Sequence, residues 1–464
     1  MHHGHKNLLF IHLESISWQT LNAFPESFPN LLRIMPSTRR FRSYFSSATS
    51  TQMVMASLLH GNSFELDAAP GLARPAANNP SLFSILESRG YRTEFLCVSA
   101  FSIGPMMPLL ANSLPPVWTT SDFAELLAKF ETAIAQRPFA AYVWNLVTHI
   151  GHAIALESHS DSIDDLVSGA CAVADRIVGA LFDLLERHGV LDETVVVLFG
   201  DHGDDFWTHG FKRGVTHGAE PYAHVTHAPL LIRDPALPAM NDYRMASTVD
   251  LEPTCLDLAE IPAALPFSES GISLAFGGEH AVCFSQNFTA NQPDAPERDV
   301  RKAFCVYDSS YALLVSTRGL ELFNHKLDPT NHCNLLHLFE LVDGELALRV
   351  PGERIGIHLA TLLEFMTNGE RAVTLRFKEL QCELRQHISK KNRYVAEHAQ
   401  PPFKVLDLSS LDAINRHGRS AYFGALNDAD APTAPSAAGA PRDTRTALRN
   451  IKDALLGRSR NAGH

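Results

Sequence analysis

Residues 194–205, TVVVLFGDHGDD, form a β-branched apolar run that leads into a charged turn. Valine-rich runs favour strands, and the glycines and acidic residues that follow favour a turn. In a parallel sheet, active sites gather at the carboxyl ends of the strands, which is where Asp201 and His202 stand. This stretch therefore predicts an α/β fold with a functional site that includes Asp201.

Apolar runs and amphipathic segments alternate on the N-terminal side of this stretch. Such alternation is typical of a mostly parallel central sheet flanked by helices. After about residue 270, short strands with close turns predict a small antiparallel subdomain. The expected strands also include 7–13, 92–99, 137–147, 280–288, 302–308, 311–317 and 320–324, and the expected helices are 81–91, 164–190 and 356–398.

The pattern divides the chain into five expected regions. Composition changes mark the last two, because an Ala/Pro/Asp-rich stretch favours a disordered linker. The regions are a catalytic α/β domain (6–270), an antiparallel subdomain completing the catalytic unit (271–345), a mainly helical extension (346–426), the linker (427–441) and a basic amphipathic tail (442–464).

The composition excludes some classes of function. The 464 residues carry a net charge of -12, which argues against nonspecific binding of nucleic acid because that needs a basic surface. The seven cysteines are scattered without a CxxC pair and do not suggest a disulfide framework. An acidic protein that acts on an anionic substrate must neutralise that charge locally, for example with a metal ion.

The cellular location is predicted from the targeting and membrane segments of the sequence. No secretory signal and no membrane-length apolar run is visible, so we expect a cytoplasmic protein. In the tail, Leu448, Ile451, Leu455 and Leu456 would share one helix face beside basic residues. We hypothesise peripheral contact of this tail with the inner face of a membrane. The alternatives are a helix packed on its own domain or on a partner, and a frayed terminus.

Ligand-type side chains end two predicted strands. Glu14 ends the first strand, and Asp201 and His202 end the strand of 194–200. Carboxylates and imidazole suit Zn²⁺ or Mn²⁺. Each residue taken alone has an ordinary structural explanation, but together with Thr51 they predict a metal site.

Thr51 itself allows two interpretations. Ser50 and Thr51 precede an apolar run, MVMASLLHG, that predicts a helix. A hydroxyl at this point is either a helix cap or a nucleophile in the positive potential of the helix terminus.

Residues 201–232 are unusually rich in histidine. A loop of His, Gly and Lys offers metal ligands and donors to an anionic oxygen. The alternative is a surface loop with incidental histidines. The five histidines are His202, His209, His217, His224 and His227.

These motifs resemble the alkaline-phosphatase superfamily, in particular its sulfatase-like branch. The resemblance covers about residues 6–336 and depends on several marks in the family's order. They are NLLFIHLES (7–15), FPNLLRI (28–34), SLFSILESRGYRT (81–93), FGDHGD (199–204), TVDLEPTCLDLAEIP (248–262) and GLELFNHKLDPTNHCNLL (319–336).

The resemblance implies that Thr51 is the nucleophile. In sulfatases the nucleophile lies ten residues before a glycine, which is Gly61 here. That nucleophile is a Cys or Ser converted to formylglycine, and threonine cannot be converted in that way. A threonine is similar to phosphoryl-transfer members, and THGAEPYAHVTHAPLLI (216–232) is closest to phosphoethanolamine transferases.

The same resemblance implies the roles of the other residues. One Zn²⁺ or Mn²⁺ is expected, and Thr148 stands where two-metal relatives have an aspartate, so a complete second metal site is not expected. His217 joins Thr51 as a catalytic residue. The implied metal ligands are Glu14, Thr51, Asp201 and His202, and the implied substrate-binding residues are His149, His152, His209 and Lys212.

The expected activity is a metal-dependent transferase or hydrolase of phosphoesters with a phosphothreonine intermediate. The expected partners are a phosphoester donor and an acceptor, either water or an alcohol on a glycan or lipid. Phosphoethanolamine transferases are membrane-anchored, whereas this chain begins almost at the first strand, so their lipid donor and location do not carry over. The alternatives are a sulfuric-ester hydrolase and a non-catalytic binding protein.

Overall fold

The computed structural model has an eight-stranded sheet at its centre, in the order β4-β3-β5-β1-β6-β7-β2-β8. Every neighbouring pair is parallel except the two pairs that include β7. This confirms the predicted mostly parallel sheet. The strands are β1 (Asn7–Leu13), β2 (Arg39–Phe45), β3 (Arg92–Val98), β4 (Val117–Thr120), β5 (Phe139–Asn145), β6 (Thr194–Gly200), β7 (Leu230–Arg233) and β8 (Asn241–Ser247).

The structure describes only part of the chain. The described residues are 5–63, 80–99, 113–149, 163–205, 217, 220–262, 271–287, 303–316, 319–342, 345–348 and 369–398. The predicted linker and basic tail lie outside these residues, and the five expected regions stay a prediction. Within the described ranges, no helix is long and apolar enough to cross a membrane.

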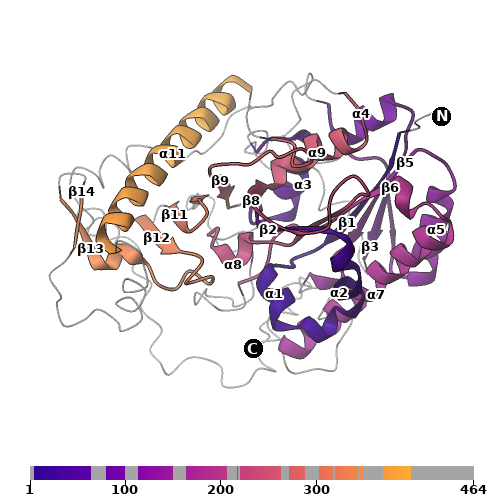
Figure 1. The fold of residues 1–464 in the computed structure, drawn as a ribbon, viewed down its shortest axis with the longest axis horizontal. Coiled ribbons are helices and arrows are strands. Elements are labelled where there is room, and N and C mark those ends of the chain that lie inside the picture. The colour runs from indigo at the N-terminus through magenta and orange to yellow at the C-terminus, as the bar shows by residue number, and fades with distance from the viewer. Residues whose placement is uncertain are drawn as a thin grey trace, which may run out of the picture.

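Helices cover both faces of the large sheet, and Figure 1 shows them around the strands. Apolar residues of β1 alternate between the two cores, because successive side chains of a strand point to opposite faces. One core lies beneath α1 (Trp18–Ala23), α2 (Pro29–Ile34), α5 (Phe123–Ile134) and α7 (Ile163–Arg187), and the other beneath α3 (Thr51–His60), α4 (Leu82–Ser88) and α9 (Leu251–Leu258).

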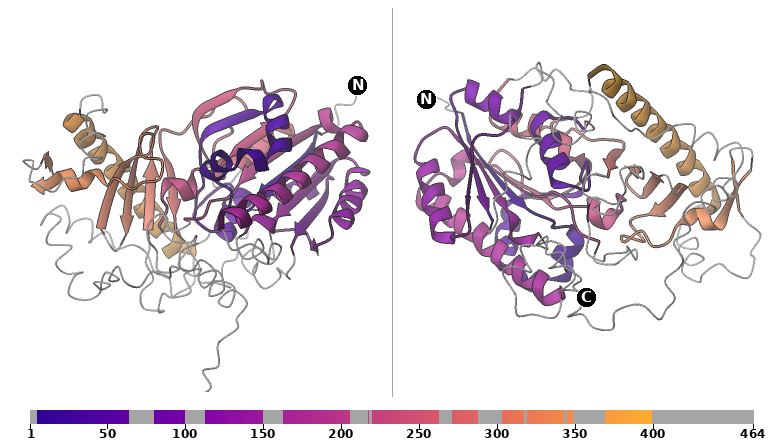
Figure 2. Two further views of the ribbon diagram at one scale, coloured as in Figure 1. Left: turned by 90° about the horizontal axis from the view of Figure 1, so that it is seen from below. Right: turned by 180° about the vertical axis from the view of Figure 1, so that it is seen from behind.

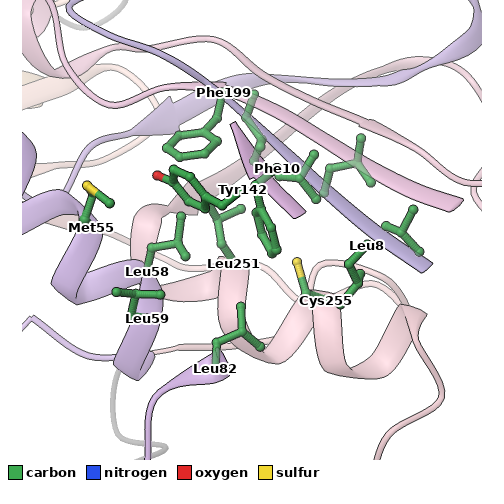
Figure 3. Close-up of a cluster of buried hydrophobic side chains, with 14 of the residues drawn as sticks. Leu8, Phe10, Met55, Leu58, Leu59, Leu82, Tyr142, Phe199, Leu251 and Cys255 are labelled. Carbon is green, nitrogen blue, oxygen red and sulfur yellow. The ribbon is translucent and has the colours of Figure 1, made fainter. Parts of the chain in front are cut away.

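Helix α3 is anchored in the second of these cores. Its Met55, Leu58 and Leu59 point toward Phe10 of β1 and Tyr142 of β5 (Figure 3). Burying several large apolar side chains fixes the helix axis relative to the sheet, at roughly 1.5–3 kcal/mol for each side chain. The first residue of α3 is therefore held at a defined distance from the strand ends.

Short helices complete the large domain and its connections. They are α8 (Ala223–Thr226), η1 (Pro25–Ser27), η2 (Met35–Ser37), η4 (Leu146–Thr148), η5 (Leu191–Glu193) and η6 (Thr248–Asp250). One further short helix, η8 (Leu335–Leu338), belongs to the antiparallel part of the fold described next.

A smaller antiparallel sheet lies beside the β2–β8 edge of the large one, as the two views of Figure 2 show. It confirms the predicted antiparallel part of the fold. Helix α11 (Gly369–His398) packs on one face of it through an apolar stripe that includes Val373, Phe377 and Leu384. The strands are β9 (Cys283–Gln286), β10 (Ala303–Tyr307), β11 (Tyr311–Ser316) and β12 (Gly319–Asn324), and a separate hairpin is formed by β13 (Phe339–Val342) and β14 (Glu345–Leu348).

Candidate active site

The ends of β1 and β6 bring two carboxylates together. The two strands are neighbours, with Leu13 paired to Gly200, so Glu14 and Asp201 follow at the same edge of the sheet. Both carboxylates are fully buried. The backbone N–H of Ser15 donates a hydrogen bond to Asp201 Oδ1 over 2.9 Å, which fixes the orientation of this side chain.

Thr51 directs its hydroxyl toward this pair of carboxylates. Its Oγ1 donates to Glu14 Oε1 over 2.8 Å and lies 3.2 Å from His202 Nε2. The N-cap position of α3 belongs to Ser50, whose side chain makes no capping hydrogen bond, and Thr51 is the first helical residue. The geometry thus assigns the Thr51 hydroxyl to the cluster at the strand ends and not to the helix cap.

His202 presents a lone pair to the same point. Its Nδ1 lies 3.1 Å from the carbonyl oxygen of Gly203, so Nδ1 carries the proton in the neutral ring. Burial lowers the pKa of His202, which favours that neutral form. Nε2 is the atom near Thr51 and lies 3.2 Å from Asp201 Oδ2. Because Nε2 carries no proton in this form, it can either bind a metal cation or accept a proton.

His12 belongs to the cluster as well, and the sequence analysis did not include it. Its Nε2 lies 3.5 Å from Glu14 Oε2 and 3.4 Å from Asp201 Oδ2, and its Nδ1 lies 3.0 Å from Tyr142 Oη. The available signal was the spacing: residues two apart in a strand point to the same side. His12 and Glu14, in FIHLES, have that spacing.

The donor set of two carboxylates and an imidazole fits a divalent metal ion. Ligand atoms of His12, Glu14 and Asp201 all lie within 4.8 Å of one another. Two of them, His12 Nε2 and Asp201 Oδ2, are buried with no hydrogen-bond partner among the described residues. Buried polar atoms without partners are costly, and a cation at this point would satisfy both.

The two carboxyl groups of the cluster differ in their pKa shifts. Burial, and then the neighbouring Asp201, raise the pKa of Glu14 well above its usual value. Burial also acts to raise the pKa of Asp201, but His202 and His12 outweigh it and lower that pKa. Glu14 is therefore the carboxyl group of the pair with the higher proton affinity, and a cation bound there would compete with its proton.

His217 and His149 are the only predicted phosphate-contacting residues that the described structure includes. The His217 ring centroid lies 4.6 Å from that of His202 and 5.1 Å from that of His149. The His217 Nδ1 lies 2.8 Å from Asp204 Oδ1. Burial acts to lower the pKa of His217, but the Asp204 carboxylate outweighs it and raises that pKa. The predicted His152, His209 and Lys212 lie outside the described residues.

Two histidines of the predicted cluster have structural partners instead. His224 Nε2 lies 2.5 Å from Asp205 Oδ1, and the buried His227 has its Nε2 2.8 Å from the carbonyl oxygen of Arg42. Not every histidine of 201–232 therefore belongs to the candidate site.

A cavity of about 130 Å³ lies between Ser47, His280 and α11. None of the residues that gather at the ends of β1 and β6 lines it.

Gly200 leaves room for the turn that carries the ligands. A Cβ at this position would overlap the carbonyl oxygen of Ile16 and lie 2.9 Å from Pro229 Cδ. We expect Gly200→Ala to destabilise the fold by about 1–3 kcal/mol and to displace Asp201. Chemical denaturation and metal content would measure the two effects. An unchanged denaturation midpoint would contradict this close packing.

The mostly parallel sheet, with carboxylate and imidazole groups at the carboxyl ends of β1 and β6, has the fold of solved proteins of the alkaline-phosphatase-like class. The sulfatase family matches residues 6–261, more than half of the chain, and the chain belongs to that family.

Known relatives are similar over different shares of the chain. Arylsulfatase K of Bos taurus is 36% identical over 107 residues, which is 22% of this chain and 18% of that protein. The match thus spans less than a fifth of this relative. A solved 2-O GAG sulfatase is similar with a TM-score of 0.61 at 16% identity, covering 87% of this chain and 96% of that one. A solved alkaline phosphatase superfamily protein from Vibrio parahaemolyticus has a TM-score of 0.54 at 15% identity, covering 70% and 81%.

These relatives bear on the two predicted activities. They support the sulfatase-like branch, whereas the expected closeness to phosphoethanolamine transferases gains no support from them. They favour the alternative of a sulfuric-ester hydrolase over the main expectation of phosphoester transfer.

Proposed function

We propose that this protein is a metal-dependent hydrolase of sulfuric esters, with Thr51 as the attacking group. One observation carries the proposal: Thr51 Oγ1 is held between Glu14 Oε1 and His202 Nε2, beside the carboxylate of Asp201. A hydroxyl held against a proton acceptor is arranged for nucleophilic attack. The names of the relatives support sulfate as the esterified group.

The reaction divides into two displacements. The Thr51 proton passes to Glu14 Oε1 while Oγ1 bonds to sulfur, and the bond from sulfur to the departing alcohol oxygen breaks. His217, whose pKa the Asp204 carboxylate raises, gives a proton to that oxygen. The oxygen of a water molecule then bonds to sulfur while the water gives a proton to His217. The bond from sulfur to Oγ1 breaks and Oγ1 takes back the proton from Glu14, which releases sulfate and the free hydroxyl. A divalent ion held by His12, Glu14, Asp201 and His202 would neutralise substrate oxygens and favour the ionised hydroxyl.

A phosphoester substrate is the second candidate, and the identity of Thr51 favours it. Threonine cannot become formylglycine, the form that sulfatases use, whereas direct attack by a hydroxyl suits phosphoryl transfer. The two half-reactions would be the same with phosphorus in place of sulfur. The acceptor would be water or an alcohol of a glycan or lipid, and the ion would be Zn²⁺ or Mn²⁺.

Substrate assays with trapping separate the candidates. Metal-loaded protein would be given aryl sulfate, aryl phosphate monoester and aryl phosphodiester in parallel, and release of the shared aryl alcohol would be followed. A label in sulfur or phosphorus identifies the trapped group, because the two threonine adducts have nearly equal masses. Sulfate release with labelled Thr51 supports the first candidate, and a phosphorus label there supports the second. Loaded protein that cleaves none of the three would instead support a non-catalytic binding role.

The pH dependence of turnover tests His217 as the proton donor. Because Asp204 raises the pKa of His217, the donating form persists to higher pH, and turnover should fall as pH rises through that pKa. The pair also adds stability that is full below the unfolded-state pKa and is lost as pH rises through the folded-state pKa. Asp204→Asn should therefore move the alkaline limb of the rate profile to lower pH.

Asp205→Asn is the matched control for this shift. Asp205 is the next carboxylate along the chain and pairs with His224 instead of His217. Its substitution should leave the position of the alkaline limb unchanged. Equal profiles for Asp204→Asn and the unmodified protein would rule out His217 as the group that titrates.

A further inference from the structure

Helix α11 places a lysine inside the protein, close to the segment that carries Thr51. Lys391 is 1% exposed and extends the apolar stripe of α11 by three positions beyond Ile388. Lysine is almost never buried without specific contacts. The Nζ atom donates to the carbonyl oxygen of Ser63 over 3.0 Å and makes a short hydrogen bond to Gln286 Oε1.

Gln286 connects this lysine to the backbone that precedes Thr51. As the last residue of β9, Gln286 donates its N–H to Ser47 over 3.1 Å and accepts from the N–H of Thr49 over 3.0 Å. Its Nε2 also lies 3.7 Å from Met53 Sδ, in the first turn of α3. Gln286, which contacts Lys391 through its side chain, therefore also contacts the chain on both sides of Thr51.

Ser63, the other partner, lies just beyond the opposite end of α3. The helix ends at His60, and Gly61 follows with a φ of 60°, which turns the chain toward Ser63. A single Nζ atom thus joins the segment after α3 to the strand that holds the segment before it. These contacts link parts of the chain separated by 328 and 105 residues.

We propose that Lys391 is a positioning residue that fixes both ends of α3, so that the Thr51 hydroxyl stays between Glu14 and His202. The catalytic part of this proposal rests on the function proposed above. Both acceptors are neutral carbonyl oxygens, so the link needs two N–H donors, which the ammonium and the amine each supply. Burial lowers the pKa of Lys391, and the link survives loss of its charge.

The placement matters because attack requires close alignment. Displacing a reacting group by about 1 Å can cost a factor of about 100 in rate. Apolar packing fixes the axis of α3, but its first turn and the preceding loop depend on the hydrogen bonds of Ser47 and Thr49 to Gln286. Loosening Gln286 should therefore affect Thr51 more than it affects the global fold.

Lys391→Met tests this link, with Lys390→Met as its matched control. Methionine keeps the apolar length of the side chain and removes the donors, while Lys390 is an exposed lysine on the same helix. The primary measurement is amide hydrogen exchange of residues 47–53 in folded, metal-loaded protein. We expect faster exchange in Lys391→Met alone, with kcat lowered about 10- to 100-fold and KM nearly unchanged. Unchanged exchange in this segment would overturn the proposal.

Gln286→Leu gives a second, independent test. It removes the acceptor of the Lys391 hydrogen bond but keeps the backbone bonds to Ser47 and Thr49. It should also speed amide exchange of residues 47–53. If Lys391→Met does not fold, the exchange of Gln286→Leu tests the proposed link in its place. The exchange readout does not depend on turnover. A protein that cleaves no ester but shows the exchange difference would refute the proposed function and keep the positioning role.

Discussion

Thr51→Ala should lower turnover by at least about a thousandfold while leaving the protein folded and metal-loaded. The substitution removes the only atom proposed to bond to sulfur or phosphorus, and loss of a nucleophile costs orders of magnitude in rate. Its structural cost is small, because the lost hydrogen bond to Glu14 contributes about 1 kcal/mol. The cap position of α3 belongs to Ser50, so the helix keeps its N-terminus. Steady-state kinetics and thermal unfolding would measure the two effects.

Two further variants separate a nucleophile from a structural hydroxyl. Ser57→Ala removes a buried hydroxyl of the same helix and should keep normal turnover. Among the described residues this hydroxyl donates only to a carbonyl oxygen of the helix backbone, that of Met53. Thr51→Ser keeps the reactive oxygen and should retain measurable turnover. If Thr51→Ala is slightly less stable but normally active, the hydroxyl has a structural role and the proposed mechanism is wrong.

Asp201→Asn should weaken metal binding by at least about a hundredfold and remove turnover with it. The amide keeps the shape of the side chain but replaces an anionic ligand by a neutral one, and changes even outside the ligand set cost 10- to 100-fold in affinity. Asp201 Oδ2 is one of the buried atoms that lack a hydrogen-bond partner among the described residues, which is why we assign it to the cation. Elemental analysis after chelation and reloading would give metal content, the identity of the ion and whether one equivalent binds.

Asp234→Asn is the control for this variant. Asp234 is also a buried carboxylate, and it pairs with Lys6 over 2.7 Å. It follows β7, which runs antiparallel to β6, so it lies at the other end of the strands from Asp201. Its loss should lower stability and leave metal content intact. Full metal occupancy and turnover in Asp201→Asn would contradict the assignment of the ligands.

The class of fold could be predicted from the sequence because it depends on local periodicity. Alternating strands and helices, with close turns after residue 270, are properties of neighbouring residues, and the structure has both sheets they predicted. The position of Glu14 and Asp201 at one edge followed as well, because parallel neighbouring strands end at the same edge. A closer reading of strand spacing would have added His12.

The substrate class was not predictable in the same way. The fragment around Thr51 favoured phosphoryl transfer, whereas similarity over the larger domain favours sulfatases. Replacing cysteine or serine by threonine at the nucleophile position changes the chemistry without changing the fold. The fold therefore does not decide between the two classes of substrate.

What the sequence determined by itself was the alternation of strands and helices and the polar residues that end β1 and β6, since these follow from the periods of 2 and 3.6 residues. It did not predict β2, β4, β7 or β8 of the large sheet. The tertiary structure decided where the Thr51 hydroxyl points, because its partners Glu14 and His202 are 37 and 151 residues away. It also decided that Lys391 lies buried between Ser63, which follows the Thr51 helix, and Gln286, which is bonded to the segment before that helix. Such contacts depend on how α3, β9 and α11 pack, and packing of distant segments leaves no local periodicity in the chain.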